Sequence, residues 1–125
     1  MPDAPVIGIV DDDSSMREAL LGLVQSLGCR AVAFASAEHF LAAAEPAALA
    51  CLILDVRMPG LDGIALQALL RDRGHRLPIL FMTSYVDART RARALEGGAI
   101  GFLGKPVDDD ALIACLRGAL AAQEV

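Results

Sequence analysis

Aspartates that follow apolar runs are the residues best suited to chemistry in this sequence. The run VIGIV ends in three consecutive aspartates, Asp11, Asp12 and Asp13, and the run ACLILD ends in Asp55. Adjacent carboxylates repel one another at neutral pH and need water or a cation between them. Proteins commonly hold Mg²⁺ with one or two carboxylates, a carbonyl oxygen and several waters. The aspartates therefore indicate a divalent-cation site, provided that the fold brings them together.

A threonine and a lysine occupy similar positions after two further apolar runs. Thr83 ends the run LPILFMT, and Lys105 follows the run AIGFLG. A hydroxyl and an ammonium group attract phosphoryl oxygens, and a carboxylate beside them can act as a nucleophile that forms an aspartyl phosphate. The four runs together favour Mg²⁺-dependent phosphoryl transfer to a carboxylate.

Short apolar runs alternate with segments of helical spacing along the whole chain. The pattern predicts strands at 6–10, 30–35, 50–55, 77–83 and 99–104, and helices at 14–28, 36–45, 62–74, 86–98 and 107–123. A β/α unit repeated five times with short connections implies a parallel sheet, and right-handed crossovers place helices on both of its faces. We expect one α/β domain that covers residues 1–125.

Such a sheet gathers the polar residues at one edge. Ligands bind beyond the carboxyl ends of parallel strands where strand order reverses, which for the order 2-1-3-4-5 lies between the first and third strands. Asp11, Asp12 and Asp55 would flank that crevice, with Thr83 and Lys105 farther along the same edge. Consecutive side chains point in different directions, so Asp13 is expected to face solvent or to help cap the following helix.

Two caps and a second acidic triplet have structural explanations. Ser14 is the expected cap of helix 14–28, and Asp62 that of helix 62–74. The triplet Asp108, Asp109 and Asp110 opens the last helix, where carboxylates pair with free amide groups and the positive end of the helix dipole. This second triplet therefore needs no cation.

Composition narrows the classes of partner. The chain has 125 residues, 16 acidic against 11 basic residues and a net charge of −5, so we expect no direct nucleic-acid contact and no membrane contact. The three cysteines are widely spaced in apolar surroundings and are expected to be unpaired core residues. These features predict a cytoplasmic protein.

Four motifs together resemble a known family. They are IVDDDSSMR (9–17), LILDVRMPGLDG (52–63), FMTS (81–84) and GAIGFLGKP (98–106). Over its whole length the chain resembles the receiver domain of two-component response regulators, the CheY-like family, and its spacing is closest to receivers of the FixJ type. The resemblance implies a (βα)5 flavodoxin-like fold with strand order 2-1-3-4-5.

The resemblance also implies roles for the acidic residues. Asp55 would be the phospho-acceptor. Mg²⁺ would be bound at Asp11, Asp12, Asp55 and the backbone carbonyl of Arg57, with Asp12 contacting the ion directly and Asp11 acting mainly through a metal-bound water. Thr83 would hydrogen-bond the phosphoryl group.

Further expectations concern switching and partners. Lys105 would pair with the phosphoryl group, aimed by a cis peptide bond to Pro106, and Phe102 would swing inward when Thr83 moves toward the phosphate. The partner would be a sensor histidine kinase. A homodimer through the fourth helix, fifth strand and last helix is an alternative to a merely solvated face around Arg89, Arg91 and Arg93.

Two other functions compete with this one. A haloacid-dehalogenase-type phosphatase also uses an aspartyl nucleophile, and Asp11 and Asp13 form the Asp-x-Asp pattern of that class. The chain is short for such an enzyme and has no obvious substrate-capping insertion. A receiver-like module that binds partners without phosphorylation is disfavoured, because the acceptor, the acidic pair, the threonine and the lysine are all present.

Overall fold

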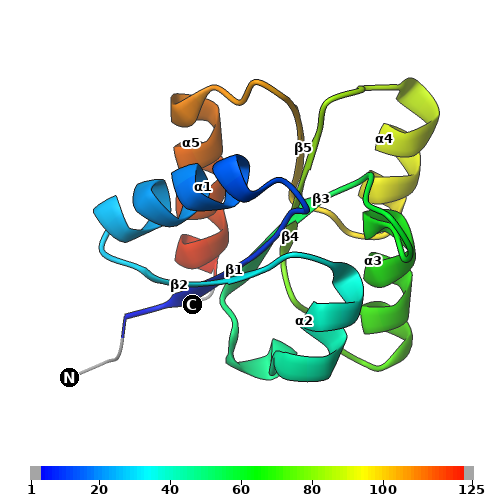
Figure 1. Cartoon of the computed structure of the whole chain (residues 1–125), viewed down its shortest axis with the longest axis horizontal. Helices are drawn as coiled ribbons and strands as arrows, with labels where there is room; N and C mark the ends of the chain where they lie inside the picture. Colours follow the sequence, from blue (N-terminus) through cyan, green and yellow to red (C-terminus); the bar gives the residue numbers. More distant parts are fainter. Residues whose placement is uncertain (1–3, 123–125) are drawn as a thin grey trace.

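The computed structural model describes residues 4–122 and contains one parallel sheet (Figure 1). Its strands are β1 Val6–Val10, β2 Arg30–Phe34, β3 Cys51–Asp55, β4 Ile79–Thr83 and β5 Gly101–Gly104. They pair in the order β2-β1-β3-β4-β5, and every pairing is parallel. The predicted strand order is confirmed, with each strand within two residues of its expected position at either end.

Helices cover both faces of this sheet. They are α1 Ser14–Ser26, α2 Ala37–Ala43, α3 Gly63–Asp72, α4 Ala88–Glu96 and α5 Asp109–Ala122. Figure 1 shows α1 and α5 on one face and α2, α3 and α4 on the other. This arrangement is what right-handed crossovers produce when strand order reverses once, between β1 and β3.

The alternation of side chains along the central strands builds two separate cores. In β3, Leu52 and Leu54 face the α2–α3–α4 layer, where Leu66 is buried. Cys51 and Ile53 point to the opposite face and pack in the α1–α5 layer. Successive strand residues point to opposite faces, so a strand buried on both faces must be apolar throughout, as β3 is until Asp55.

Local side-chain caps determine where the helices begin. Asp13 is the N-cap of α1 and accepts hydrogen bonds from the backbone amides of Ser15 at 2.9 Å and Met16 at 3.4 Å. Ser14 is the first helical residue, so its expected role as the cap is wrong. A carboxylate accepts two amide donors more readily than a hydroxyl does, and Asp13 already stands in the extended conformation that a cap requires.

Other boundaries follow the same principle. Asp62 caps α3 at the amide of Ala65, as expected, with a distance of 2.8 Å. Asp87 caps α4 at the amide of Thr90, so this helix begins at residue 88 and not at residue 86. A short 3₁₀ helix at Pro46–Ala48, which the sequence pattern did not predict, connects α2 to β3.

The second acidic triplet lies where it was expected. Asp109 and Asp110 occupy the first turn of α5, and the carboxylate of Asp108 accepts a hydrogen bond from the amide of Ala111 at 3.2 Å.

Cys29, Cys51 and Cys115 are free thiols, two of them buried. Within residues 4–122, no helix has the length and apolar character needed to cross a membrane.

Candidate functional site

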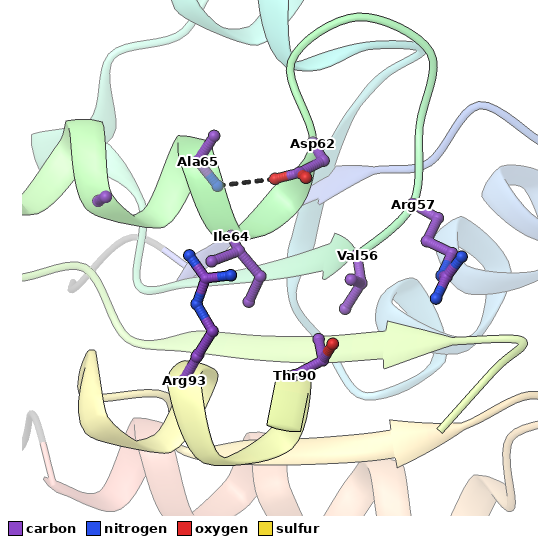
Figure 2. Close-up of a pocket in the computed structure, with 8 residues that line it drawn as sticks. Val56, Arg57, Asp62, Ile64, Ala65, Thr90 and Arg93 are labelled. Atoms are coloured by element: carbon purple, nitrogen blue, oxygen red, sulfur yellow. Dashed lines mark hydrogen bonds between the residues drawn. The ribbon is translucent and has the colours of Figure 1, made fainter. Parts of the chain in front are cut away.

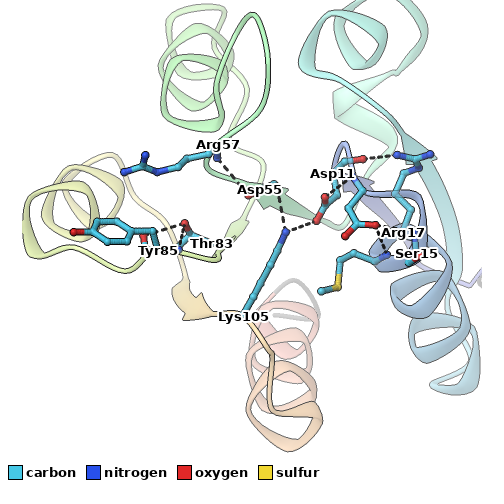
Figure 3. Close-up of polar contacts among 10 residues, drawn as sticks. Asp11, Ser15, Arg17, Asp55, Arg57, Thr83, Tyr85 and Lys105 are labelled. Atoms are coloured by element: carbon cyan, nitrogen blue, oxygen red, sulfur yellow. Dashed lines mark hydrogen bonds and ion pairs between the residues drawn. The ribbon is translucent and has the colours of Figure 1, made fainter.

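Asp11, directly after β1, is fixed by four contacts at the carboxyl edge of the sheet. Its amide donates to the carbonyl of Phe34 in β2 at 3.2 Å. Its Oδ1 accepts from the amide of Asp13 at 2.9 Å, and its Oδ2 accepts from Nζ of Lys105 at 2.8 Å. Its carbonyl oxygen accepts from Nη1 of Arg17 at 2.7 Å (Figure 3). With 1% exposure, this carboxylate has little freedom to move.

Asp55 ends β3 beside Asp11 and is almost as buried, at 6% exposure. Its Oδ1 accepts from the amide of Arg57 at 3.3 Å, and its Oδ2 accepts from Nζ of Lys105 at 3.2 Å. Burial, and secondarily the charge of Asp11, raises the pKa of Asp55 above its ordinary value, although Lys105 and the Arg57 amide act in the opposite direction. The fold therefore disfavours the charged form of Asp55 relative to water.

The glycine that starts α3 permits this helix to approach Asp55 closely. A Cβ on Gly63 would overlap the backbone carbonyl oxygen of Asp55. The amide of Gly63 donates to the carbonyl of Val56 at 2.9 Å, which holds the helix start against the strand end. A side chain at residue 63 would push the carboxyl end of β3 away from its neighbours.

Three carboxylates form the group that we call the acidic cluster, namely Asp11, Asp12 and Asp55. One oxygen from each lies within 4.8 Å of the other two. Asp12 is exposed, whereas its two partners are buried, so the cluster opens to solvent on the Asp12 side. Hard carboxylate oxygens at this spacing, beside accessible water, are a donor set that fits Mg²⁺.

Lys105 directly follows the edge strand β5 and reaches the acidic cluster along the carboxyl edge of the sheet. Its side chain is 15% exposed and forms ion pairs with both Asp11 and Asp55. Burial alone would lower the pKa of Lys105, but its hydrogen bond to Asp11 and the charges of the two carboxylates raise that pKa above its ordinary value. The peptide bond between Lys105 and Pro106 is cis, as the resemblance implied.

Thr83 lies at the carboxyl edge as predicted, but its hydroxyl is engaged elsewhere. This buried hydroxyl donates to the carbonyl of Tyr85 at 3.1 Å and lies 3.2 Å from the amide of Tyr85, from which it accepts. Phe102 is partly buried in β5 and packs against Phe81, with the ring centroids 6.3 Å apart and the planes tilted by 46°. In this conformation the Thr83 hydroxyl bonds the β4–α4 loop, and within residues 4–122 it forms no hydrogen bond with the acidic cluster.

The side chain of Arg57 connects two loops at this edge. Its guanidinium lies 5.1 Å from the centre of the Tyr85 ring and 4.0 Å from the carboxylate of Asp87. The amide and hydroxyl of Thr90 hydrogen-bond Asp87 and lower the pKa of that carboxyl. The β3–α3 loop, which carries the carbonyl expected to bind a cation, is thus in contact with the start of α4.

A groove between α3 and α4 lies beside this site and is separate from it. It has a volume of about 360 Å³, and Figure 2 shows Arg93 of α4 facing Ile64 of α3 across it. Its lining includes Arg57 but none of the acidic cluster. The acidic cluster therefore lies outside this groove.

Sequence reasoning missed two residues that shape the site, Arg17 and Asp87. Arg17 lies in the first turn of α1, and a positive side chain is unfavourable at the positive end of a helix dipole. An arginine at this position therefore indicates a nearby group that accepts a hydrogen bond from it. The signal for Asp87 was its spacing of three residues from Thr90, which is typical of a helix cap.

Comparisons with known sequences agree with this geometry. A sequence model of the response regulator receiver domain matches residues 7–117. Response regulator protein TodT of Pseudomonas putida is 40% identical over 117 residues, which are 94% of this chain and 52% of TodT. Transcriptional regulatory protein FixJ of Azorhizobium caulinodans is 38% identical over 120 residues, which are 96% of this chain and 57% of FixJ. The chain spans about half the length of these curated relatives.

Solved structures show the same fold. Response regulator StyR matches with a TM-score of 0.89 and 39% identity, covering 96% of this chain and 61% of the StyR chain. Chemotaxis protein CheY4 of Vibrio cholerae matches with a TM-score of 0.85 and 27% identity, covering 94% of this chain and 100% of CheY4. Since the family match extends over residues 7–117 and the strand order is that of its relatives, the chain belongs to the response regulator receiver domains of two-component systems.

Proposed function

We propose that this receiver accepts a phosphoryl group on Asp55 from a sensor histidine kinase, in a reaction that requires Mg²⁺. The observation that carries the proposal is Lys105, whose ammonium bridges Asp11 and Asp55 beside the open carboxylate of Asp12. The ammonium group of Lys105 already pairs with the two buried carboxylates. The exposed carboxylate of Asp12 leaves the acidic cluster open on one side for Mg²⁺.

The proposed transfer is a displacement at phosphorus. An oxygen of Asp55 attacks the phosphorus of a phosphohistidine, the new O–P bond forms, and the N–P bond breaks with its electron pair returning to the histidine. Mg²⁺, held by Asp11, Asp12, Asp55 and the carbonyl of Arg57, would neutralise charge on the phosphoryl oxygens. The ammonium group of Lys105, which now pairs with the Asp55 carboxylate, would pair with the phosphoryl group after transfer.

Two features of Asp55 support its role as the acceptor. Its burial disfavours the charged carboxylate, so conversion to an acyl phosphate whose charge lies farther out, near a cation and Lys105, relieves part of that cost. The amide of Arg57 and Nζ of Lys105 already orient its two oxygens. Orientation of a nucleophile before reaction lowers the entropic part of the barrier.

The switch that we propose begins at Thr83. To bind a phosphoryl oxygen, its hydroxyl must leave the backbone of Tyr85, which frees the loop before α4. Phe102 is only partly buried, so inward movement of its ring would fill space near Thr83. The switch therefore exchanges one set of local contacts for another, and phosphorylation biases the two states.

We propose a homodimer through α4, β5 and α5, which exposed apolar side chains on and beside α4 support. Val86, Leu95 and Ile100 are exposed by 55%, 39% and 40%, and all three lie on α4 or the loops beside it.

We propose a cytoplasmic location, in which the free thiols are compatible with a reducing environment.

A haloacid-dehalogenase-type phosphatase is less well supported. That mechanism needs Asp11 as the nucleophile and Asp13 as the acid. The Asp11 carboxylate is paired with Lys105 and the Asp13 amide, and the Asp13 carboxylate caps α1. Both groups are engaged in contacts that the phosphatase mechanism would have to break.

Acetyl phosphate, a small phosphodonor, tests the proposal directly. With Mg²⁺, intact-mass spectrometry should detect one added phosphoryl group on the wild-type chain, none on the Asp55→Asn variant, and much less on Asp12→Asn. Asp13→Asn is the matched control and should label like the wild type. Undiminished labelling of Asp55→Asn would refute the acceptor assignment, and turnover of phosphate esters that depends on Asp11 alone would favour the phosphatase. A wild-type chain that never labels would favour a binding module.

A further inference from the structure

Arg17 is a cation in an unfavourable place with a specific partner. It lies in the first turn of α1, where the free amide groups carry partial positive charge and a positive side chain is destabilising. Its Nη1 donates to the carbonyl oxygen of Asp11 at 2.7 Å, and the side chain is partly buried there (Figure 3). The contact therefore has a short, charge-assisted geometry that offsets the position.

The carbonyl that Arg17 holds belongs to the peptide unit that joins Asp11 to Asp12. A peptide unit is planar, so the direction of this carbonyl determines the direction in which the chain leaves toward Asp12. The other groups of Asp11 are bound to Phe34, Asp13 and Lys105. Arg17 is thus the contact that acts on the link between the buried carboxylate and the exposed one.

Asp12 has little else to orient it. Its side chain is exposed, and its carboxylate forms no hydrogen bond or ion pair with another group among residues 4–122. Nevertheless an Asp12 oxygen lies within 4.8 Å of oxygens from Asp11 and Asp55. The backbone must therefore aim this side chain at the cluster.

We infer that Arg17 is a positioning residue for the cation site: by holding the Asp11 carbonyl, it keeps the Asp12 carboxylate directed toward Asp11 and Asp55. The inference rests on the proposed function for the identity of the cation. In this role Arg17 acts through the Asp11 backbone carbonyl that its Nη1 binds.

Charge and position predict opposite outcomes when Arg17 is replaced. If Arg17 acted only as a nearby positive charge, its removal would strengthen binding of a divalent cation, since like charges repel. If it positions Asp12, its removal weakens binding, and loss of groups that orient metal ligands typically costs about 10- to 100-fold in affinity. The sign of the change therefore separates the two explanations.

Mg²⁺ titration by calorimetry of the unphosphorylated chain provides that sign. Arg17→Met keeps the aliphatic stem and is expected to raise the Kd for Mg²⁺ by about tenfold. Arg17→Lys retains the charge and one donor and should recover part of the affinity. Arg117→Met removes an exposed charge from the second half of α5 and should leave the Kd within about twofold of the wild type. Unchanged or tighter binding by Arg17→Met would overturn the inference.

General loosening of α1 is controlled by a second variant. Val24→Ala removes buried methyl groups from the same helix and lowers stability without touching the Asp11 carbonyl. It should bind Mg²⁺ like the wild type. If it loses as much affinity as Arg17→Met, Arg17 has only a structural role and the inference fails.

A metal-free measurement separates this inference from the proposed function. The amide of Asp13 donates to Asp11 Oδ1, so its hydrogen exchange, read by NMR in EDTA, reports how well the turn is held. Arg17→Met should speed this exchange while the amides of Leu20 and Val24 remain protected. If the wild type binds no Mg²⁺, the proposed cation fails, but faster exchange would still establish that Arg17 orders the turn. Unchanged exchange at Asp13 would overturn the inference even if Mg²⁺ binds.

Discussion

Nζ of Lys105 lies 2.8 Å from Oδ2 of Asp11, although the two residues are 94 positions apart in the chain. They follow β5 and β1, which are separated in the sheet by β3 and β4. The lysine therefore reaches along the carboxyl edge and contacts Asp55 on the way. This contact connects the last strand to the first and places one positive charge between the two buried carboxylates.

Removal of that charge should destabilise the fold. In Lys105→Met the carboxylates of Asp11 and Asp55 lose their shared partner, and breaking a buried ion pair from one side costs about 3 kcal/mol. Urea unfolding in EDTA at neutral pH measures the loss. Added Mg²⁺ should restore part of it, because the cation replaces the missing charge. Arg117→Met is the control for loss of an exposed charge, and an equal effect there would contradict the prediction.

Asp55→Asn should stabilise the metal-free protein at neutral pH. The pKa of Asp55 is raised in the fold, so the folded chain binds this proton more tightly than the unfolded chain does. The stability that the group contributes is complete below the ordinary carboxyl pKa and is lost as pH rises through the raised value. Asparagine cannot ionise, so the gain in Tm should be clear at neutral pH and small in acid. A lower Tm for Asp55→Asn at neutral pH would contradict this sign.

Replacement of Asp12 and of Asp13 should have different effects on stability and on Mg²⁺ binding. Asp13→Ala removes the cap of α1 and should cost about 1 kcal/mol of stability, while labelling by acetyl phosphate persists. Asp12→Ala removes an exposed carboxylate from the acidic cluster and should leave the Tm unchanged or higher while Mg²⁺ binding is lost. Denaturant melts and Mg²⁺ titrations on both variants test the pair. Equal behaviour of the two would show that Asp12 and Asp13 do not have separate roles.

Two glycines in helices should respond in opposite ways to the same change. Gly63→Ala places a methyl group against the carbonyl of Asp55 and should destabilise the fold by about 2 kcal/mol, as overpacking does. Gly22→Ala adds a methyl group to α1 that no heavy atom outside the neighbouring residues and the backbone of that helix approaches within 4 Å, and it should stabilise by about 1 kcal/mol through helix propensity. Thermal melts compare them directly. Gly63→Ala should also slow phosphorylation, since the acceptor shifts.

Much of the fold could be predicted from the sequence because its signals are local. The apolar runs around Ile7 and Leu52 are buried on both faces in the structure, and such runs can be recognised without knowing their neighbours. The placement of Asp11, Asp55, Thr83 and Lys105 at one edge followed from parallel strands alone. Helix ends were less accurate, because caps such as Asp13 and Asp87 depend on backbone conformation at single residues.

The sequence by itself determined the order of elements and the set of groups at the carboxyl edge, since both depend on side-chain type and spacing along the chain. Only the tertiary structure decided which of these groups touch. Lys105 pairs with Asp11 as well as Asp55, the Thr83 hydroxyl faces Tyr85, and Arg17 holds the Asp11 carbonyl. The Lys105 contacts join strands that are 94 and 50 residues apart in the chain, so they depend on how the sheet is assembled. The Thr83 and Arg17 contacts are local in the chain, but they depend on the backbone conformation of the loops after β4 and β1, which residue type and spacing do not determine.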